Sequence, residues 1–143
     1  MLMGLLIASV ALIVLSMLFS ISESAFLSMN KLRLRILRKE RDKRALRVGR
    51  LLEKKELLIN TLLVANELVN ILLSSIITAV AMKLFGRRGV GYATFVVTLL
   101  LLVFGEITPK AISTRNPDGI AYALSLFVDV VMHILHPVVY VLT

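Results

Sequence analysis

The feature that most constrains this chain is the uncharged apolar stretch at residues 2–22, which is followed by two further long apolar stretches. About 20 predominantly apolar residues are enough to cross a bilayer as a helix. We therefore expect membrane spans at about residues 2–28, 57–82 and 92–108. The chain has 143 residues, of which 58% are hydrophobic, so one helical bundle accounts for most of its length. The sequence predicts an all-α membrane protein with three transmembrane helices.

Positive charge is concentrated between the first two expected spans. Of the 17 Lys and Arg residues, 12 lie between Lys31 and Lys55, where leucines recur among them. Cytoplasmic loops carry such an excess, and basic amphipathic helices lie at membrane surfaces. We therefore expect amphipathic juxtamembrane helices over residues 31–55, on the cytoplasmic side and against anionic lipid headgroups. Nucleic acid is the alternative partner for a basic segment, but the flanking spans argue against it. Three spans then place the amino terminus outside and the carboxyl terminus in the cytoplasm.

A last apolar stretch covers residues 119–143 and is interrupted by polar side chains and a proline. The interrupting residues are Asp129, His133, His136 and Pro137. Charged groups inside a membrane are costly, and a proline disrupts a helix interior. We expect this stretch to be a juxtamembrane helix, interfacial or partly re-entrant, and not a fourth span.

Polar residues recur every four positions in the first two spans. The first ladder consists of Ser16, Ser20, Ser24 and Ser28, and the second consists of Asn66, Asn70, Ser74 and Thr78. Residues four apart share one helix face, and lipid offers polar groups no partner. The two ladders should therefore face each other or a cavity. Hydroxyl groups also serve plain helix packing, and we assign that role to Ser16, Ser28, Ser75 and Thr78.

The third span ends with a carboxylate and a proline that can complete a cation site. A rise of about 1.5 Å per residue places Glu106 and the middle positions of both ladders at overlapping depths. Pro109 has no N–H and crowds the carbonyl four residues before it, which belongs to Gly105. That carbonyl should lose its helical partner beside the Glu106 carboxylate, as in the broken helices of transporters.

Together these groups form an all-oxygen candidate set. Its members are Ser20, Ser24, Asn66, Asn70, Gly105 and Glu106. Hydroxyl, amide, carbonyl and carboxylate oxygens favour hard cations such as Mg²⁺, Ca²⁺ or Na⁺. Glu23 and Glu67 are each one residue from a ladder position, so either could line the cavity, pair with Lys110 or lie at a subunit contact.

Several motifs resemble the transmembrane domain of the CorC/CNNM family. They are Ser22-Glu23 after the first apolar helix, Asn66 and Asn70 in the second, and Phe104-Gly-Glu-Ile-Thr-Pro-Lys110 at the end of the third. The resemblance covers nearly the whole chain, and Gly-Glu-Ile-x-Pro-Lys is its most specific part. It implies three membrane helices with juxtamembrane helices, a homodimer, and a Mg²⁺ site at the six positions given above. It also implies cytosolic CBS domains, which these 143 residues do not contain.

The function expected from this resemblance is Mg²⁺ export across the cell (inner) membrane, driven by Na⁺ entry. The first alternative is a regulatory membrane protein that senses Mg²⁺ without transporting it. The second is a structural anchor whose ladders only hold helices together. We expect no enzymatic activity, because no nucleophile–base pair or phosphate-binding loop is visible.

Overall fold

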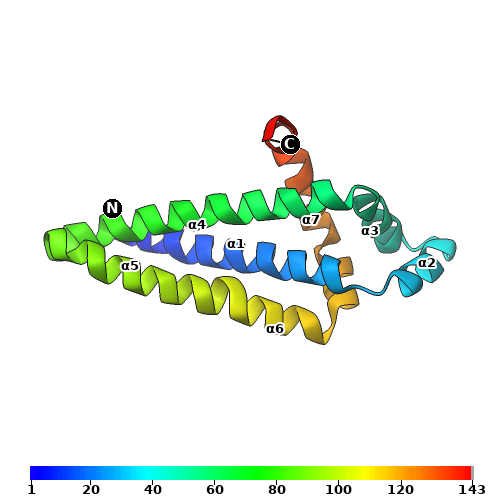
Figure 1. The fold of residues 1–143 in the computed structure, drawn as a ribbon, viewed down its shortest axis with the longest axis horizontal. Helices are drawn as coiled ribbons and strands as arrows, with labels where there is room; N and C mark the ends of the chain where they lie inside the picture. The colour runs from blue at the N-terminus through cyan, green and yellow to red at the C-terminus, as the bar shows by residue number, and fades with distance from the viewer. Residues whose placement is uncertain (143) are drawn as a thin grey trace.

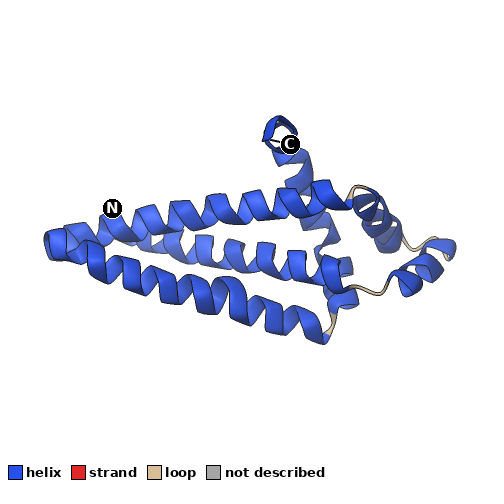
Figure 2. Cartoon of the chain, in the orientation of Figure 1, coloured by secondary structure: helices blue, strands red, loops and turns tan. Residues whose placement is uncertain are grey.

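Every regular element of residues 1–142, the part of the chain that the computed structural model describes, is a helix (Figure 2). This confirms the prediction of an all-α fold. Three stretches of these residues are long and apolar enough to cross a membrane, namely Leu2–Ser28, Lys55–Arg115 and Pro117–Leu142. The middle stretch turns back on itself, so it supplies two of the rods described next (Figure 1).

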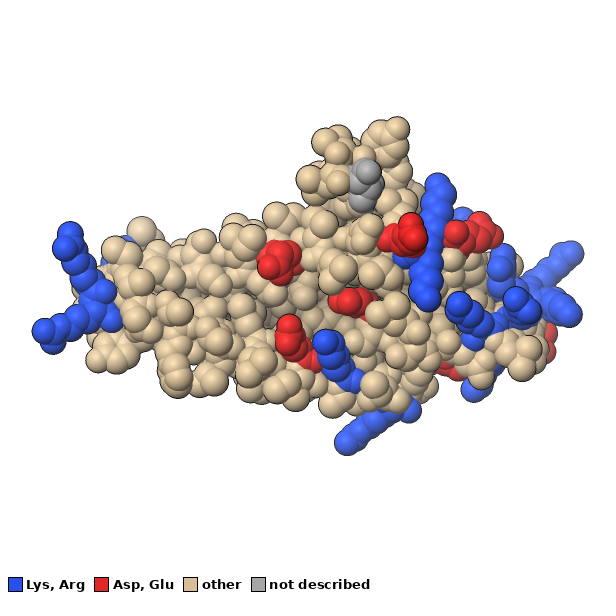
Figure 3. All heavy atoms as spheres, viewed as in Figure 1, with Lys and Arg blue, Asp and Glu red and all other residues tan. Residues whose placement is uncertain are grey.

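Three long rods lie side by side along the length of the molecule (Figure 1). They are α1 (Leu2–Ser28), α4 (Lys55–Phe85), and a third rod made of α5 (Gly89–Leu100), a π-helical segment (Leu101–Ile107) and α6 (Thr108–Arg115). The side chains between the two ends are mostly uncharged, whereas Lys and Arg gather at both ends (Figure 3). A mostly uncharged band between two basic ends is the pattern expected of a bundle that spans a bilayer.

The hairpin between α4 and α5 closes through a short 3₁₀ turn, Gly86–Arg88. Gly86 has a φ of 66°, in the left-handed region that favours glycine. Gly89 then starts α5 against the carbonyl group of Ala81, so close that a Cβ atom would have no room. Glycine thus meets two different needs in this hairpin, backbone conformation at Gly86 and close approach at Gly89.

The basic segment folds as two short amphipathic helices, α2 (Lys31–Lys39) and α3 (Lys43–Glu53). Each begins at a side chain that caps its first turn. The Asn30 carboxamide oxygen accepts from two backbone N–H groups of α2, and the Asp42 carboxylate does the same for α3. Amphipathic helices over residues 31–55 were predicted, and the structure contains them.

The last helix, α7 (Pro117–Leu142), crosses the other rods near the end that carries α2 and α3 (Figure 1). Asp118 accepts a hydrogen bond of 2.7 Å from the backbone N–H of Asn30. Arg47 of α3 donates to Ser125 over 3.4 Å. A direction across the bundle is the one expected of an interfacial helix, although length and composition also qualify α7 as a span. Its placement relative to a bilayer stays a prediction.

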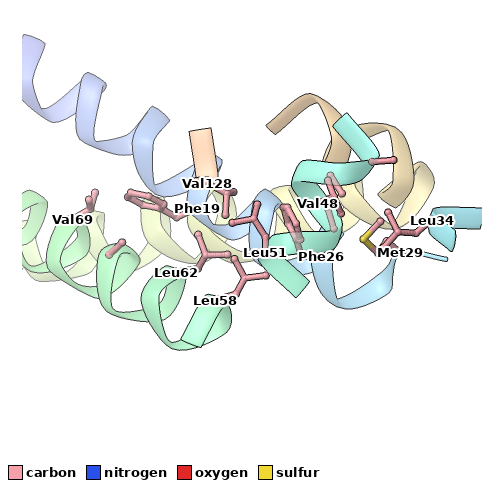
Figure 4. Packing of buried hydrophobic residues seen from close by; sticks show 14 residues of the cluster. Phe19, Phe26, Met29, Leu34, Val48, Leu51, Leu58, Leu62, Val69 and Val128 are labelled. Atoms are coloured by element: carbon pink, nitrogen blue, oxygen red, sulfur yellow. The ribbon is translucent and has the colours of Figure 1, made fainter. Parts of the chain in front are cut away.

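Most of the large buried side chains lie at this same end, where α1, α3, α4 and α7 meet (Figure 4). Leu58, Leu62, Val48 and Val128 are completely buried there. Truncating such a side chain to Ala typically costs about 2–5 kcal/mol for Leu. The rest of α1, by contrast, exposes residues such as Val10 and Val14, which would face lipid. This core sets the register of α1 against α4, and that register positions the polar ladders.

Candidate cation site

The two polar ladders face each other across the contact between α1 and α4, as predicted. The Ser16 hydroxyl oxygen lies 2.9 Å from the amide oxygens of both Asn66 and Asn70. The Asn66 amide nitrogen donates to the Ser20 hydroxyl oxygen over 3.3 Å. Hydrogen bonds between facing helices are the usual outcome for polar groups that lipid cannot satisfy.

The third rod joins this cluster through its backbone. The Ser20 hydroxyl donates to the carbonyl oxygen of Gly105. A Cβ at position 105 would lie 3.4 Å from the Ser16 hydroxyl oxygen, so glycine keeps this backbone close to α1 without crowding. The carbonyl that Pro109 was predicted to release is therefore directed into the cluster.

The helix itself differs from the expectation, because it does not break at Pro109. It continues to Arg115, and the irregularity lies just before the proline, in the π-helical segment Leu101–Ile107. There the N–H of Thr108 donates to the carbonyl of Val103, five residues earlier. In a π-helical segment each N–H bonds to the carbonyl five residues earlier instead of four. The chain can therefore accommodate Pro109, which has no N–H, and remain helical. Such segments are frequent at functional sites.

In this cluster two amide oxygens share one hydroxyl hydrogen, that of Ser16. A single Ser16 proton cannot serve two amide oxygens at the same time. Five oxygen atoms from three rods converge here, and they belong to Ser16, Ser20, Asn66, Asn70 and Gly105. A hard cation is a chemical partner that such a set would satisfy.

Glu106 lies beside this cluster, not within its hydrogen bonds. Its side chain is exposed and lines a cleft of about 510 Å³ between α4 and the third rod. Asn70 lines the same cleft, so it links the cleft to the oxygen cluster. Glu67 also lines this cleft, whereas Glu23 is half-buried and interacts electrostatically with Lys110 and Glu106.

The remaining serines considered from the sequence lie outside this cluster. Ser24 is half-buried, and none of the described residues forms a hydrogen bond with its side chain. Ser28 is exposed, and the Ser75 hydroxyl bonds to its own helix at the Ile71 carbonyl over 2.9 Å. Ser16 was assigned to packing from the sequence, and its hydroxyl does bond to a neighbouring helix, between the two asparagine amides of α4. The only sequence signal that could have placed Ser16 among the candidate cation ligands was its position four residues before Ser20.

Carboxylates and imidazoles do not assemble a metal site of their own. Within residues 1–142, no group of three or more His, Cys, Asp or Glu side chains is arranged to hold a metal ion.

The fold and this cluster define a class: a helical, multi-pass membrane protein with an oxygen-rich polar cluster between its long helices. Within that class the chain belongs to the CNNM family, because residues 7–143 match the domain described as the cyclin M transmembrane N-terminal domain.

Relatives from several organisms are consistent with this membership. The chain is 38% identical to a UPF0053 protein of Haemophilus influenzae over 91% of its own length. It is 40% identical to the UPF0053 inner membrane protein YfjD of Escherichia coli over 87% of its length. A DUF21 domain-containing chloroplastic protein of Arabidopsis thaliana is 35% identical over 59% of this chain, which is 13% of that protein. The chain spans 31% and 29% of the two bacterial relatives, roughly a third of their length.

Proposed function

We propose that this domain binds Mg²⁺ at the oxygen cluster and exports it across the membrane in exchange for Na⁺. The observation that carries the proposal is that oxygen atoms from three rods form one continuous set of close contacts, through Ser16 and Ser20 of α1. Mg²⁺ prefers about six oxygen ligands in near-octahedral geometry at about 2.0–2.1 Å. The hydroxyl, amide and carbonyl oxygens would replace water around the ion.

Glu106 would supply the negative charge in this scheme. It shares a cleft with Asn70, whose amide oxygen belongs to the cluster. A carboxylate that turns from the cleft towards Asn70 would neutralise part of the cation's charge, and Ser24 would add a hydroxyl. The Glu106 side chain would then lie in the cleft when no ion is bound and turn to the ion when one binds.

The surroundings of the site belong to the same proposal. We expect a homodimer in the cell (inner) membrane, with the amino terminus outside and the carboxyl terminus in the cytoplasm. The basic helices α2 and α3 would lie on the cytoplasmic side near anionic headgroups. CBS domains in the full-length protein would be cytosolic partners of this domain.

Replacing Ser16 with Ala should weaken Mg²⁺ binding by about tenfold, or ~1.4 kcal/mol. The substitution removes the oxygen that lies 2.9 Å from both asparagine amide oxygens. Isothermal titration of the purified protein with Mg²⁺ measures the change. The matched control is Ser9→Ala, because Ser9 is a buried serine of the same helix that bonds only to the Leu5 carbonyl. Equal effects of the two substitutions would mean that Ser16 only packs the helices.

Transport is tested in liposomes that contain only the purified protein. An imposed Na⁺ gradient should drive Mg²⁺ across the membrane, as followed with a Mg²⁺-sensitive dye inside the vesicles. Saturable Mg²⁺ binding without any flux would instead support the sensing alternative. A protein that neither binds nor transports Mg²⁺ would be an anchor.

A further inference from the structure

A second cavity, of about 440 Å³, lies away from the oxygen cluster, between the α3–α4 junction and α7. Its lining combines one lysine, two histidines and one aspartate with apolar side chains. The lining residues are Leu51, Lys54, Leu57, Asp129, Met132, His133, His136 and Pro137. Nothing in the proposed cation transport uses this cavity.

The distribution of polar and apolar residues around α7 indicates how deep in the membrane the cavity lies. One side exposes an apolar stripe at four-residue spacing, formed by Leu126, Val130, Ile134 and Val138. The polar residues Asp129, His133 and His136 follow a different stripe and line the cavity. A helix with an apolar stripe on one side and a polar stripe on another is built to lie in the interface plane. The cavity should therefore open at the level of the lipid headgroups.

The cavity also concentrates groups that attract an anion. Lys54 carries a full positive charge and immediately precedes α4, a 31-residue helix that begins without a side-chain cap. The first backbone N–H groups of such a helix carry a partial positive charge. Leu57, in that first turn, lines the cavity. Lys54 and the helix end thus contribute positive potential from the same side.

The two imidazoles lie on the α7 side of the cavity, and each contacts another residue of that helix. His133 donates from Nδ1 to the Asp129 carbonyl over 2.8 Å, and its Nδ1 lies 3.5 Å from the Asp129 carboxylate. Asp129 is therefore already engaged with His133, and Nε2 of that ring can donate to an anionic ligand when the imidazole is protonated. The ring of His136 stacks on that of Tyr140, with centroids 6.1 Å apart.

We propose that this cavity binds the phosphate group of an anionic phospholipid. Lys54, a ring N–H of His136 and the protonated form of His133 would donate hydrogen bonds to the phosphate oxygens, which accept charge-assisted hydrogen bonds well. The apolar residues Leu51, Leu57 and Met132 would contact the glycerol and the first acyl carbons, which free phosphate lacks. The bound lipid would hold α7 against the start of α4.

The test uses delipidated protein in detergent and native mass spectrometry with short-chain phosphatidylglycerol as the probe. Phosphatidylcholine and inorganic phosphate are titrated in parallel. Phosphatidylglycerol should bind saturably, and Lys54→Gln or His136→Gln should each weaken this binding by about tenfold. The matched control is Lys55→Gln, because Lys55 carries the same charge one residue later and does not line the cavity. That control should change the affinity less than about twofold.

Other results would overturn the proposal. Equal binding of phosphatidylcholine would show that the cavity does not select an anion. Binding of inorganic phosphate as strong as that of the lipid would identify a site for free phosphate. Equal losses for Lys54→Gln and Lys55→Gln, with none for His136→Gln, would indicate general attraction to a basic surface. Mg²⁺ titration of the same variants reports separately on the cation site, so the two proposals can fail independently.

Discussion

Replacing Glu106 with Gln should abolish saturable Mg²⁺ binding and leave the helical fold intact. The oxygen cluster consists of neutral donors, so we propose Glu106, one of the two carboxylates in the cleft that Asn70 lines, as the source of negative charge. Glutamine keeps the shape and one oxygen but removes the charge, and a divalent cation should then bind at least about 100-fold more weakly, or ~2.7 kcal/mol. Isothermal titration with Mg²⁺, together with thermal unfolding in the presence and absence of the ion, measures this loss.

The matched control for this change is Glu56→Gln, which removes the same charge from an exposed position in the first turn of α4. Its Mg²⁺ affinity should remain that of the parent protein. Unchanged binding in Glu106→Gln would remove Glu106 from the site. Glu67→Gln then becomes the informative variant, because Glu67 is the other carboxylate of that cleft.

Replacing Gly89 with Ala should destabilise the folded bundle by about 1–3 kcal/mol, the range for overpacking a filled space. The new Cβ would lie 2.7 Å from the carbonyl carbon of Ala81 and closer still to its oxygen. These are backbone atoms, so no side-chain rotation relieves the overlap, and the α4–α5 hairpin must open. Thermal unfolding in detergent, followed by circular dichroism, measures the effect.

Gly91→Ala is the matched control, because a Cβ at that position meets no atom within 4 Å. Alanine also favours the helix over glycine by about 1 kcal/mol. The control should therefore be neutral or slightly stabilising. If both substitutions destabilise the protein equally, the loss of stability does not come from the close approach of Gly89 to Ala81.

Much of the architecture could be predicted because membrane helices follow from local chemistry. An apolar run of sufficient length must satisfy its own backbone hydrogen bonds in lipid, and a helix does so within one segment. Residues 2–28 were predicted as a span, and α1 covers Leu2–Ser28. The continuation of the third rod to Arg115 was missed, because a π-helical segment leaves no local mark in the sequence.

The candidate site could be predicted only in part. Four-residue spacing placed Ser20, Asn66 and Asn70 on facing stripes. A hydrogen bond joins Ser20 to Asn66, and Asn70 is connected to them through the Ser16 hydroxyl. The same spacing did not show how far along each stripe the contact extends. The hydrogen-bonded contact includes Ser16 at one end of the α1 stripe and does not reach Ser24 at the other end.

The sequence by itself determined that this chain forms membrane-length helices with facing polar stripes, since both properties depend on spacing within single segments. The tertiary structure alone decided which oxygen atoms meet. The packing of Leu58 and Leu62 sets the register of α4 against α1, and the π-helical segment directs the Gly105 carbonyl to Ser20 and Glu106 into the cleft. These outcomes depend on contacts between residues as many as 85 positions apart, which no local pattern encodes.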